Sequence, residues 1–274
     1  YNTVLAGMQL DGKRFFYVNP LEVIPGISGK SPTHRHDLTT RPNWYACACC
    51  PPNAARLISS FGMYAYGENE DTAFCHMFAD GEAVFENGMK IICETKYPYG
   101  FDISYKIISG GRLAVRIPAW SKSNSAQING IPTEFETIKG YAYFNVNNGD
   151  ELIITLDSSP YYVYASSRIP QLTGKAALCR GPLVYCFEGA DNDEDILSLR
   201  IQRKGRITVS DYDEFLLGGT VSISVDAMKT AESENLYTCE PPVTYECTAK
   251  AVPYYTWGNR GENQMRVWID ELVI

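Results

Sequence analysis

Three cysteines stand within four residues of the sequence, at Cys47, Cys49 and Cys50, and Pro51-Pro52 follows them directly. A buried cysteine behaves as a small apolar residue, and a protein core does not need three of them beside a double proline. As thiolates, cysteines bind zinc with S–Zn bonds of about 2.3 Å, and a zinc site usually has four ligands. The spacing therefore predicts a reactive or metal-binding cluster, with Cys49 and Cys50 as two ligands and Cys47 as a candidate third.

The residues after the cluster predict a helix that begins close to the thiols. Pro51-Pro52 is expected to hold the backbone extended and to delay the helix, and Asn53 is a good N-cap. The apolar residues that follow repeat at helical spacing, at Leu57, Ile58, Phe61, Tyr64 and Ala65. The dipole of a helix lowers the pKa of a thiol at its N-terminus, as a bound metal does. Two interpretations stay open here: a site that performs chemistry, and a structural zinc knuckle or inert buried thiols.

The cysteine-rich stretch, Cys-Ala-Cys-Cys-Pro-Pro-Asn-Ala-Ala-Arg at 47–56, closely resembles the signature of glycoside hydrolase family 127, the bacterial β-L-arabinofuranosidases and their relatives. The resemblance continues in order through five other blocks, at 1–7, 15–22, 116–120, 180–185 and 253–261. Because these blocks extend over essentially the whole chain and several are specific, the sequence is identified as a member of this family.

The resemblance implies a retaining glycosidase with a zinc-bound cysteine nucleophile. By its place in the Cys-Cys-Pro-Pro motif, Cys49 matches the family's nucleophile and zinc ligand, and Cys50 matches a second zinc ligand. Tyr17, in the Phe-Phe-Tyr-Val-Asn-Pro block, resembles a residue that lines the sugar site, and Cys47 is assigned with it to substrate binding. For Tyr17 a place in the core of a strand stays open as the alternative.

The remaining functional groups of the family precede the blocks that match this chain. They are a Glu-x-Cys motif that supplies two zinc ligands and a Glu that acts as the acid/base, and no Glu-x-Cys precedes Cys47 here. The resemblance therefore implies the C-terminal part of a longer enzyme, with half of the site elsewhere. Glu22 is the nearest carboxylate, but it does not match the acid/base motif. An inactive fragment with a structural zinc, or with a carbohydrate-binding or scaffolding role, is the alternative function.

The composition excludes two classes of partner. The 24 basic and 32 acidic residues give a net charge of −8 without a basic run, so nucleic acid and anionic membranes are not expected partners. No stretch reaches the roughly 18 apolar residues of a transmembrane helix. Nine cysteines without the spacing of a secreted disulfide scaffold favour a cytoplasmic location. The expected partner is an L-arabinofuranoside or related glycoside, with a homodimer as one expected assembly.

The 274 residues are enough for about two domains, and the chain divides at changes of sequence texture. Residues 1–68 are predicted to contain a helix that ends at Gly7, a hairpin that turns at Asp11-Gly12 and a polar loop. By resemblance, they form the last part of an (α/α)6-barrel catalytic domain. The loop carries His34 and His36, which we interpret as solvated residues rather than as ligands of a metal or substrate.

Residues 69–167 and 168–274 are each predicted to form a β-sandwich, so the predicted fold class is mainly β. Short β-branched or alternating runs fill both ranges, separated by turn signals such as Glu86-Asn-Gly88. Trp120 and Tyr141 offer aromatic faces of the kind that stack on sugars. We favour a core or edge position for both, because aromatic residues of strands more often pack there.

The last domain carries three further predictions. The acidic loop 189–195 lacks the twelve-residue pattern of a calcium loop and is predicted to be solvated. Four cysteines are predicted to be reduced core thiols: Cys179, Cys186, Cys239 and Cys247. The family-like segment 253–261 is expected to pack back on the barrel, with Arg260 as the brace of that contact.

Overall fold

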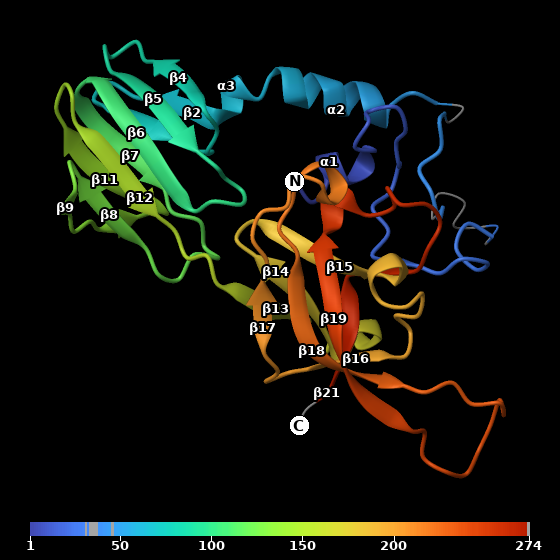
Figure 1. Ribbon diagram of the computed structural model, residues 1–274. Helices are drawn as coiled ribbons and strands as arrows, with labels where there is room; N and C mark the ends of the chain where they lie inside the picture. Colours follow the sequence, from blue (N-terminus) through green and yellow to red (C-terminus); the bar gives the residue numbers. More distant parts are fainter. Residues whose placement is uncertain (31, 33–37, 45–46, 273–274) are drawn as a thin grey trace. The chain divides into compact units, whose positions relative to one another are not determined.

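The computed structural model describes residues 1–30, 32, 38–44 and 47–272 (Figure 1). The chain forms two compact units, which we call the composite unit (Tyr1–Cys50 with Pro160–Ile274) and the middle unit (Pro51–Ser159). Strands make up most of the regular structure, which confirms the mainly β prediction. His34 and His36 lie outside the described residues. In the part of the chain that is described, no helix is long and apolar enough to cross a membrane.

The first residues of the composite unit form a short helix and a tight turn, as the sequence predicts. Helix α1 (Val4–Gly7) ends at Gly7, whose carbonyl accepts a hydrogen bond of 2.7 Å from the Phe16 N–H. Between them the chain turns at Asp11-Gly12, where Gly12 has a positive φ of 72°. The chain thus returns beside α1, and Phe16 and Tyr17 lie close to the end of this helix.

Helix α2 (Cys50–Ser59) begins three residues earlier than predicted. Pro51-Pro52 lies inside its first turn, where N–H groups have no acceptor within the helix and the fixed φ of proline is suitable. Asn53 is therefore not an N-cap, and its side chain accepts a hydrogen bond of 3.1 Å from Arg56. A separate helix, α3 (Gly62–Ala65), carries the end of the apolar pattern. The correction makes Cys50 the first residue of a helix.

Two sheets build the middle unit. The five-stranded sheet has the order β10 (Thr137–Ile138), β11 (Tyr141–Val146), β7 (Gly111–Arg116), β3 (Thr72–Cys75) and β2 (Tyr66–Glu68). The six-stranded sheet has the order β4 (Gly81–Val84), β5 (Lys90–Thr95), β6 (Asp102–Ser109), β12 (Glu151–Thr155), β8 (Ser125–Ile128) and β9 (Ile131–Pro132). Strands β3 and β7 run parallel, and the strands on either side of them pair antiparallel.

One apolar core joins the two sheets of the middle unit. Alternate residues of β6, such as Ile103 and Tyr105, are fully buried, and Leu113 of β7 in the other sheet belongs to the same core. Trp120 packs against this core, with its ring 5.9 Å from Phe101 in an edge-to-face contact. The alternation read from the sequence therefore sets which face of each sheet is buried.

A ten-stranded sheet forms the body of the composite unit. Its order is β1 (Glu22–Val23), β20 (Met265–Arg266), β15 (Leu183–Glu188), β19 (Thr244–Pro253), β18 (Ile223–Thr230), β16 (Leu199–Gln202), β21 (Trp268–Leu272), β14 (Lys175–Arg180) and β13 (Pro160–Tyr164), with β17 (Ile207–Val209) paired to β18. Four 3-10 turns accompany it, at Pro170–Leu172, Gly189–Asp191, Leu216–Gly218 and Tyr254–Thr256. Strand β13 lies in the range 69–167 that the sequence assigns to the preceding domain, but it pairs with β14 of this sheet. Strands β14 and β15 also pair with each other, so six strands close into a barrel rather than the β-sandwich predicted for residues 168–274.

The two ends of the chain share a core in the composite unit. Ala6, Phe16 and Val23 from the first residues pack with Tyr254 and Trp257 from the last turn, and all five are nearly or fully buried. Residues near the start of the chain therefore pack into the same core as residues of the ten-stranded sheet and the turn after β19. This shared core positions the segment that carries Tyr17.

Candidate active site

The three clustered thiols lie together at the start of α2. Cys47 and Cys49 are exposed, and Cys50 is half-buried. The Cys49 Sγ lies 3.7 Å from the Cys50 Sγ, and the Cys47 thiol is hydrogen-bonded to Cys49 as well. Cys49 is therefore the middle thiol, with a neighbouring sulfur on each side.

The separation of two of these sulfurs fits a zinc site. Two thiolates on one tetrahedral zinc, each at about 2.3 Å from the metal, are separated by about 3.8 Å. The observed distance between Cys49 and Cys50 is 3.7 Å, so both sulfurs can bind one zinc ion without rearrangement. Within the described residues, no group of three or more His, Cys, Asp and Glu side chains is placed to hold a metal ion. In the described part of the chain, the geometry therefore suits two of the four ligands of a zinc site, Cys49 and Cys50.

The cluster makes Cys49 the thiol that ionises first. Hydrogen bonds from the Cys50 and Cys47 thiols lower the pKa of Cys49, because they stabilise its thiolate. The bond to Cys49 raises the pKa of Cys47, while burial and then the same kind of bond raise that of Cys50. A thiolate, rather than a thiol, is the nucleophile and the metal ligand. The arrangement therefore favours Cys49 for both roles.

Tyr17 lies beside the cluster. Its hydroxyl is hydrogen-bonded to the backbone of Cys49, and its ring contacts Phe15 edge-to-face at 6.5 Å. Partial burial raises the pKa of Tyr17, and the three nearby thiols raise it further despite the bond to the Cys49 backbone. Tyr17 is only half-buried, so it is not a core residue. Its protonated hydroxyl can also act as a hydrogen-bond donor next to Cys49.

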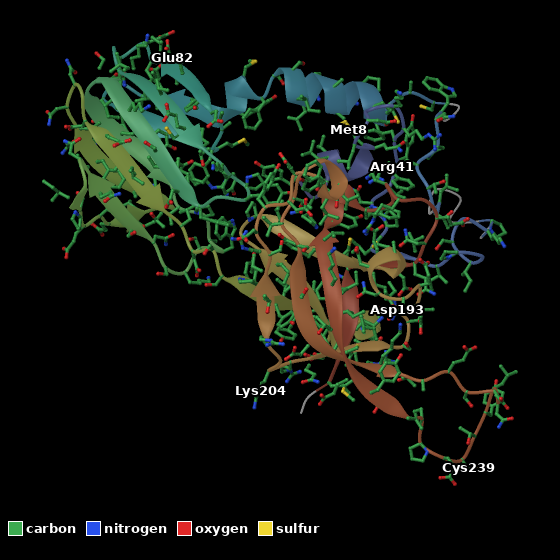
Figure 2. The ribbon with its side chains drawn as sticks, in the orientation of Figure 1. Met8, Arg41, Glu82, Asp193, Lys204 and Cys239 are labelled. Carbon is green, nitrogen blue, oxygen red and sulfur yellow. The ribbon has the colours of Figure 1, made fainter. Side chains whose placement is uncertain are left out.

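Arg41 is the buried cation that sequence reasoning missed. It is 2 % exposed, and Figure 2 labels it within the composite unit. Its Nη1 donates to the Trp257 carbonyl at 2.5 Å, and its Nη2 donates to the Ala6 carbonyl at 2.8 Å. Burial lowers the pKa of Arg41 to about 10, which leaves it protonated at neutral pH. One arginine in a polar loop has no pattern from which its burial could be predicted.

Among the described residues, Arg260 pairs with carboxylates of the ten-stranded sheet rather than with residues 1–50, which corrects the prediction. Its Nη2 lies 2.5 Å from carboxylate oxygens of both Glu188 and Asp191, and Lys250 lies 3.3 Å from Asp191. All four residues belong to the C-terminal sheet and its turns. The prediction of a solvated acidic loop is also wrong for Asp191, whose side chain is 8 % exposed. The network stabilises the C-terminal sheet itself.

Two other predictions concern residues away from the thiol cluster. Glu22, the carboxylate nearest in sequence, pairs with Arg266 on the neighbouring strand. Among the four cysteines predicted to be core thiols, Cys179 and Cys186 are buried. The prediction is wrong for Cys239, which is exposed, and for Cys247, which is half-buried. Cys239 stands on the loop 231–243 between β18 and β19, which carries it away from the sheet (Figure 2).

Three family models match the chain in order. Residues 1–63 match the β-L-arabinofuranosidase GH127 catalytic domain, 72–158 match the GH127 middle domain, and 160–270 match the glycoside hydrolase family 127 C-terminal domain. The matched ranges thus extend over nearly the whole chain, and the thiol cluster and Tyr17 fall within the range of the catalytic model.

Relatives and solved structures agree with these models. A non-reducing end β-L-arabinofuranosidase of Bifidobacterium longum is 35 % identical over 98 % of this chain. The crystal structure of a GH127 β-L-arabinofuranosidase from Geobacillus stearothermophilus matches 98 % of the chain with a TM-score of 0.91 and 37 % identity, and a GH127 β-arabinofuranosidase matches 98 % with a TM-score of 0.85 and 27 % identity. The chain spans 44 % of the length of each. The chain belongs to glycoside hydrolase family 127.

Proposed function

We propose that this chain is part of a retaining glycoside hydrolase that acts on β-L-arabinofuranosides, with Cys49 as its nucleophile. The names of the relatives supply the substrate class. The observation that carries the proposal is the position of Cys49, an exposed thiol whose pKa is lowered by the Cys50 and Cys47 thiols and whose backbone is hydrogen-bonded to Tyr17. A low pKa and solvent access are the properties that distinguish a nucleophilic cysteine from an inert one.

The proposed reaction is a double displacement at the anomeric carbon. The Cys49 thiolate forms a C–S bond as the glycosidic C–O bond breaks, and a carboxylic acid protonates the leaving oxygen. The resulting carboxylate then removes a proton from water, which attacks the same carbon and releases the thiolate. Two inversions give net retention of configuration. We propose that this carboxyl group lies in the part of the relatives' length that this chain does not span.

Three residues of the chain act around the nucleophile in this proposal. Tyr17 donates its hydroxyl proton to a sugar oxygen, and Cys47 lies on the substrate side of the cluster. Cys50 is a zinc ligand together with Cys49, and the 3.7 Å separation of their sulfurs supports that assignment. When bound, zinc keeps both thiols deprotonated at neutral pH. A thiolate that binds a metal is a weaker nucleophile, so the metal exchanges some reactivity for the correct protonation state.

The same proposal extends to the architecture. We infer that residues 1–68 complete an (α/α)6-barrel and that the middle unit is a β-sandwich. The match of residues 1–63 to a catalytic domain supports the first part. The single core between the two sheets of the middle unit supports a sandwich there.

The test replaces one thiol in the enzyme that contains this chain. Cys49→Ser should lower hydrolysis of a β-L-arabinofuranoside by about 1000-fold or more, because the alkoxide form of serine is not available at neutral pH. Its zinc content should fall as well. Cys239→Ser is the matched control, since this exposed thiol lies on the loop 231–243 and should keep both activity and zinc. Hydrolysis that survives in Cys49→Ser would exclude Cys49 as the nucleophile.

A structural zinc site is the second candidate, because Cys50 begins α2 and its sulfur is 3.7 Å from that of Cys49. A metal held there would fix the start of the helix. A Cys49→Ser protein that loses its fold together with its zinc would favour this role. A Cys49→Ser protein that stays folded but inactive would favour the nucleophile.

A further inference from the structure

The C-terminal domain reaches the residue next to Tyr17. The Phe16 ring stacks on the Trp257 ring with a centroid distance of 4.9 Å and an angle of 5° between their planes. Both residues are buried, at 2 % and 1 % exposure. Phe16 belongs to the range matched by the catalytic model and Trp257 to the range matched by the C-terminal model. The segment that carries Tyr17 is therefore held by a side chain from another domain of the family.

Arg41 fastens this stack from a third part of the chain. Its guanidinium carbon lies 4.8 Å from the centre of the Phe16 ring and 5.3 Å from that of Trp257. The two hydrogen bonds that it donates end on the carbonyls of Trp257 and Ala6. One side chain thus contacts α1, the Phe16 ring and the turn that follows β19. A guanidinium suits this position, because its planar fork serves two carbonyls while its face lies near aromatic rings.

The residue next to Arg41 is hydrogen-bonded to the segment that carries Tyr17. The carbonyl of Pro42, the next residue, accepts a hydrogen bond of 3.3 Å from the Phe15 N–H. Phe15 stands two residues before Tyr17. Arg41 contacts the Phe16 ring and its neighbour Pro42 bonds Phe15, so both residues that precede Tyr17 are held from this point of the chain.

We propose that Arg41 is a positioning residue, which locks Trp257 of the C-terminal domain onto Phe16 and so fixes Tyr17 against Cys49. The catalytic importance of this positioning rests on the proposed function, but the contacts among these residues do not. A misplacement of about 1 Å at a reacting group lowers a rate by about 100-fold, so a residue outside the site can control its activity. The C-terminal domain is then a part of the active-site wall.

A double-mutant cycle in the enzyme that contains this chain tests whether Arg41 acts through Tyr17. Arg41→Gln removes the fork and should lower kcat/KM by about 10- to 100-fold at a temperature where the protein stays folded. In a Tyr17→Ala background, the same change should lower kcat/KM by less than about twofold, because the group it positions is gone. An equal loss in both backgrounds would overturn the proposal, as would a folded Arg41→Gln protein with unchanged kcat/KM.

A conservative variant keeps the test decisive if Arg41→Gln does not fold. Arg41→Lys retains the buried charge but cannot serve the carbonyls of Trp257 and Ala6 as a fork. It should show the same dependence on Tyr17 with a smaller loss. Lys229→Met is the matched control, since Lys229 is another buried cation of the composite unit, 7 % exposed and bonded to the Asn192 carbonyl. Its effect on kcat/KM should be the same with and without Tyr17.

A measurement that does not use activity separates this proposal from the proposed function. In the present chain, amide hydrogen exchange of Phe15 and Phe16 reports their bonds to the carbonyls of Pro42 and Gly7. Arg41→Lys should speed this exchange by about tenfold relative to Lys229→Met, because the Phe16 ring loses its support. Unchanged exchange would overturn the positioning role whatever the enzyme hydrolyses. Faster exchange in an enzyme with no β-L-arabinofuranosidase activity would support the role and reject only the function.

Discussion

A single arginine holds two buried carboxylates in the C-terminal sheet. The Glu188 side chain is fully buried and accepts hydrogen bonds from Arg260, from the Gly258 N–H at 3.0 Å and from Asn263 at 3.3 Å. Although burial raises the pKa of the Asp191 carboxyl, Arg260 and Lys250 together hold it below its usual range. The Asp191 carboxylate therefore stays charged at neutral pH, and both side chains depend on the guanidinium as a partner.

Removing that guanidinium should cost far more than removing an exposed one. We expect Arg260→Met to lower the free energy of unfolding by about 3–5 kcal/mol, since it leaves buried charges without their partner. Arg206→Met is the control. Arg206 pairs with Asp226 at 3.7 Å with its side chain 77 % exposed, and its loss should cost about 0–1 kcal/mol. Urea titration of both proteins measures the difference, and similar small losses would contradict a stabilising role for the network.

The chemistry of the site could be predicted from residue types, but its supports could not. The spacing of the thiols predicted a cluster, and the resemblance supplied roles for Cys49, Cys50 and Tyr17 that stay predictions until they are tested. Arg41 carries no such signal, because its partner carbonyl on Trp257 lies 216 residues away. The partner predicted for Arg260 was wrong because its carboxylates, Glu188 and Asp191, are also distant in the sequence. An arginine in a sequence indicates that an acidic partner is needed, but it does not identify which carboxylate will lie beside it in the folded chain.

At the scale of strands, a histidine joins the five-stranded sheet of the middle unit. His76 follows β3, and its Nδ1 lies 2.7 Å from the hydroxyl of Tyr141 on β11. On β2, a Cβ added to Gly67 would lie 2.7 Å from the His76 Nε2, so only glycine leaves room for the ring. Burial lowers the pKa of His76, and the positive charge of Arg116 lowers it further. Tyr141, which offered a sugar-stacking face, is thus engaged within its own sheet.

The lowered pKa gives the stability of the chain a defined pH dependence. The folded state disfavours protonated His76, whereas the unfolded chain protonates it near the ordinary histidine pKa of about 6.5. Stability from this group is therefore fully present above about pH 6.5 and is lost as the pH falls toward the folded-state value. We expect the urea midpoint to decrease between pH 7.5 and 5.5 by more in the wild type than in His76→Gln, which cannot titrate there. Equal decreases would show that His76 does not contribute.

Element boundaries followed the sequence wherever alternation was strong. The buried positions of β6 and β12 repeat every second residue, which is the alternation that predicted strands in residues 69–167. The start of α2 was predicted too late, since proline disfavours the interior of a helix but not its first turn. Strand β13 begins with Pro160 and lies at the edge of its sheet, where a proline costs no ladder hydrogen bond.

At the scale of the molecule, each unit has its own core, so a core substitution in one unit should destabilise that unit and leave the other unchanged. Trp257→Ala empties a buried site of the composite unit and should cost about 3–5 kcal/mol. We expect faster amide exchange in β15 and β19 and unchanged exchange in β5 and β6. Leu152→Ala, in the core of the middle unit, should give the reverse pattern. A rise throughout the chain in either protein would show that the units unfold together.

The contact between Arg41 and Trp257 also sets an order of events during synthesis. Ribosomes add about 5–20 residues per second, so the 216 residues between these two positions take roughly 10–45 s to make. Throughout that interval the nascent chain carries Phe16 without its aromatic partner. The contacts that hold Phe16 can be completed only after Trp257 has been made, and ribosomes that stop earlier release chains in which these contacts cannot form. Synthesis thus delays the support of the segment that carries Tyr17 until Trp257 has emerged.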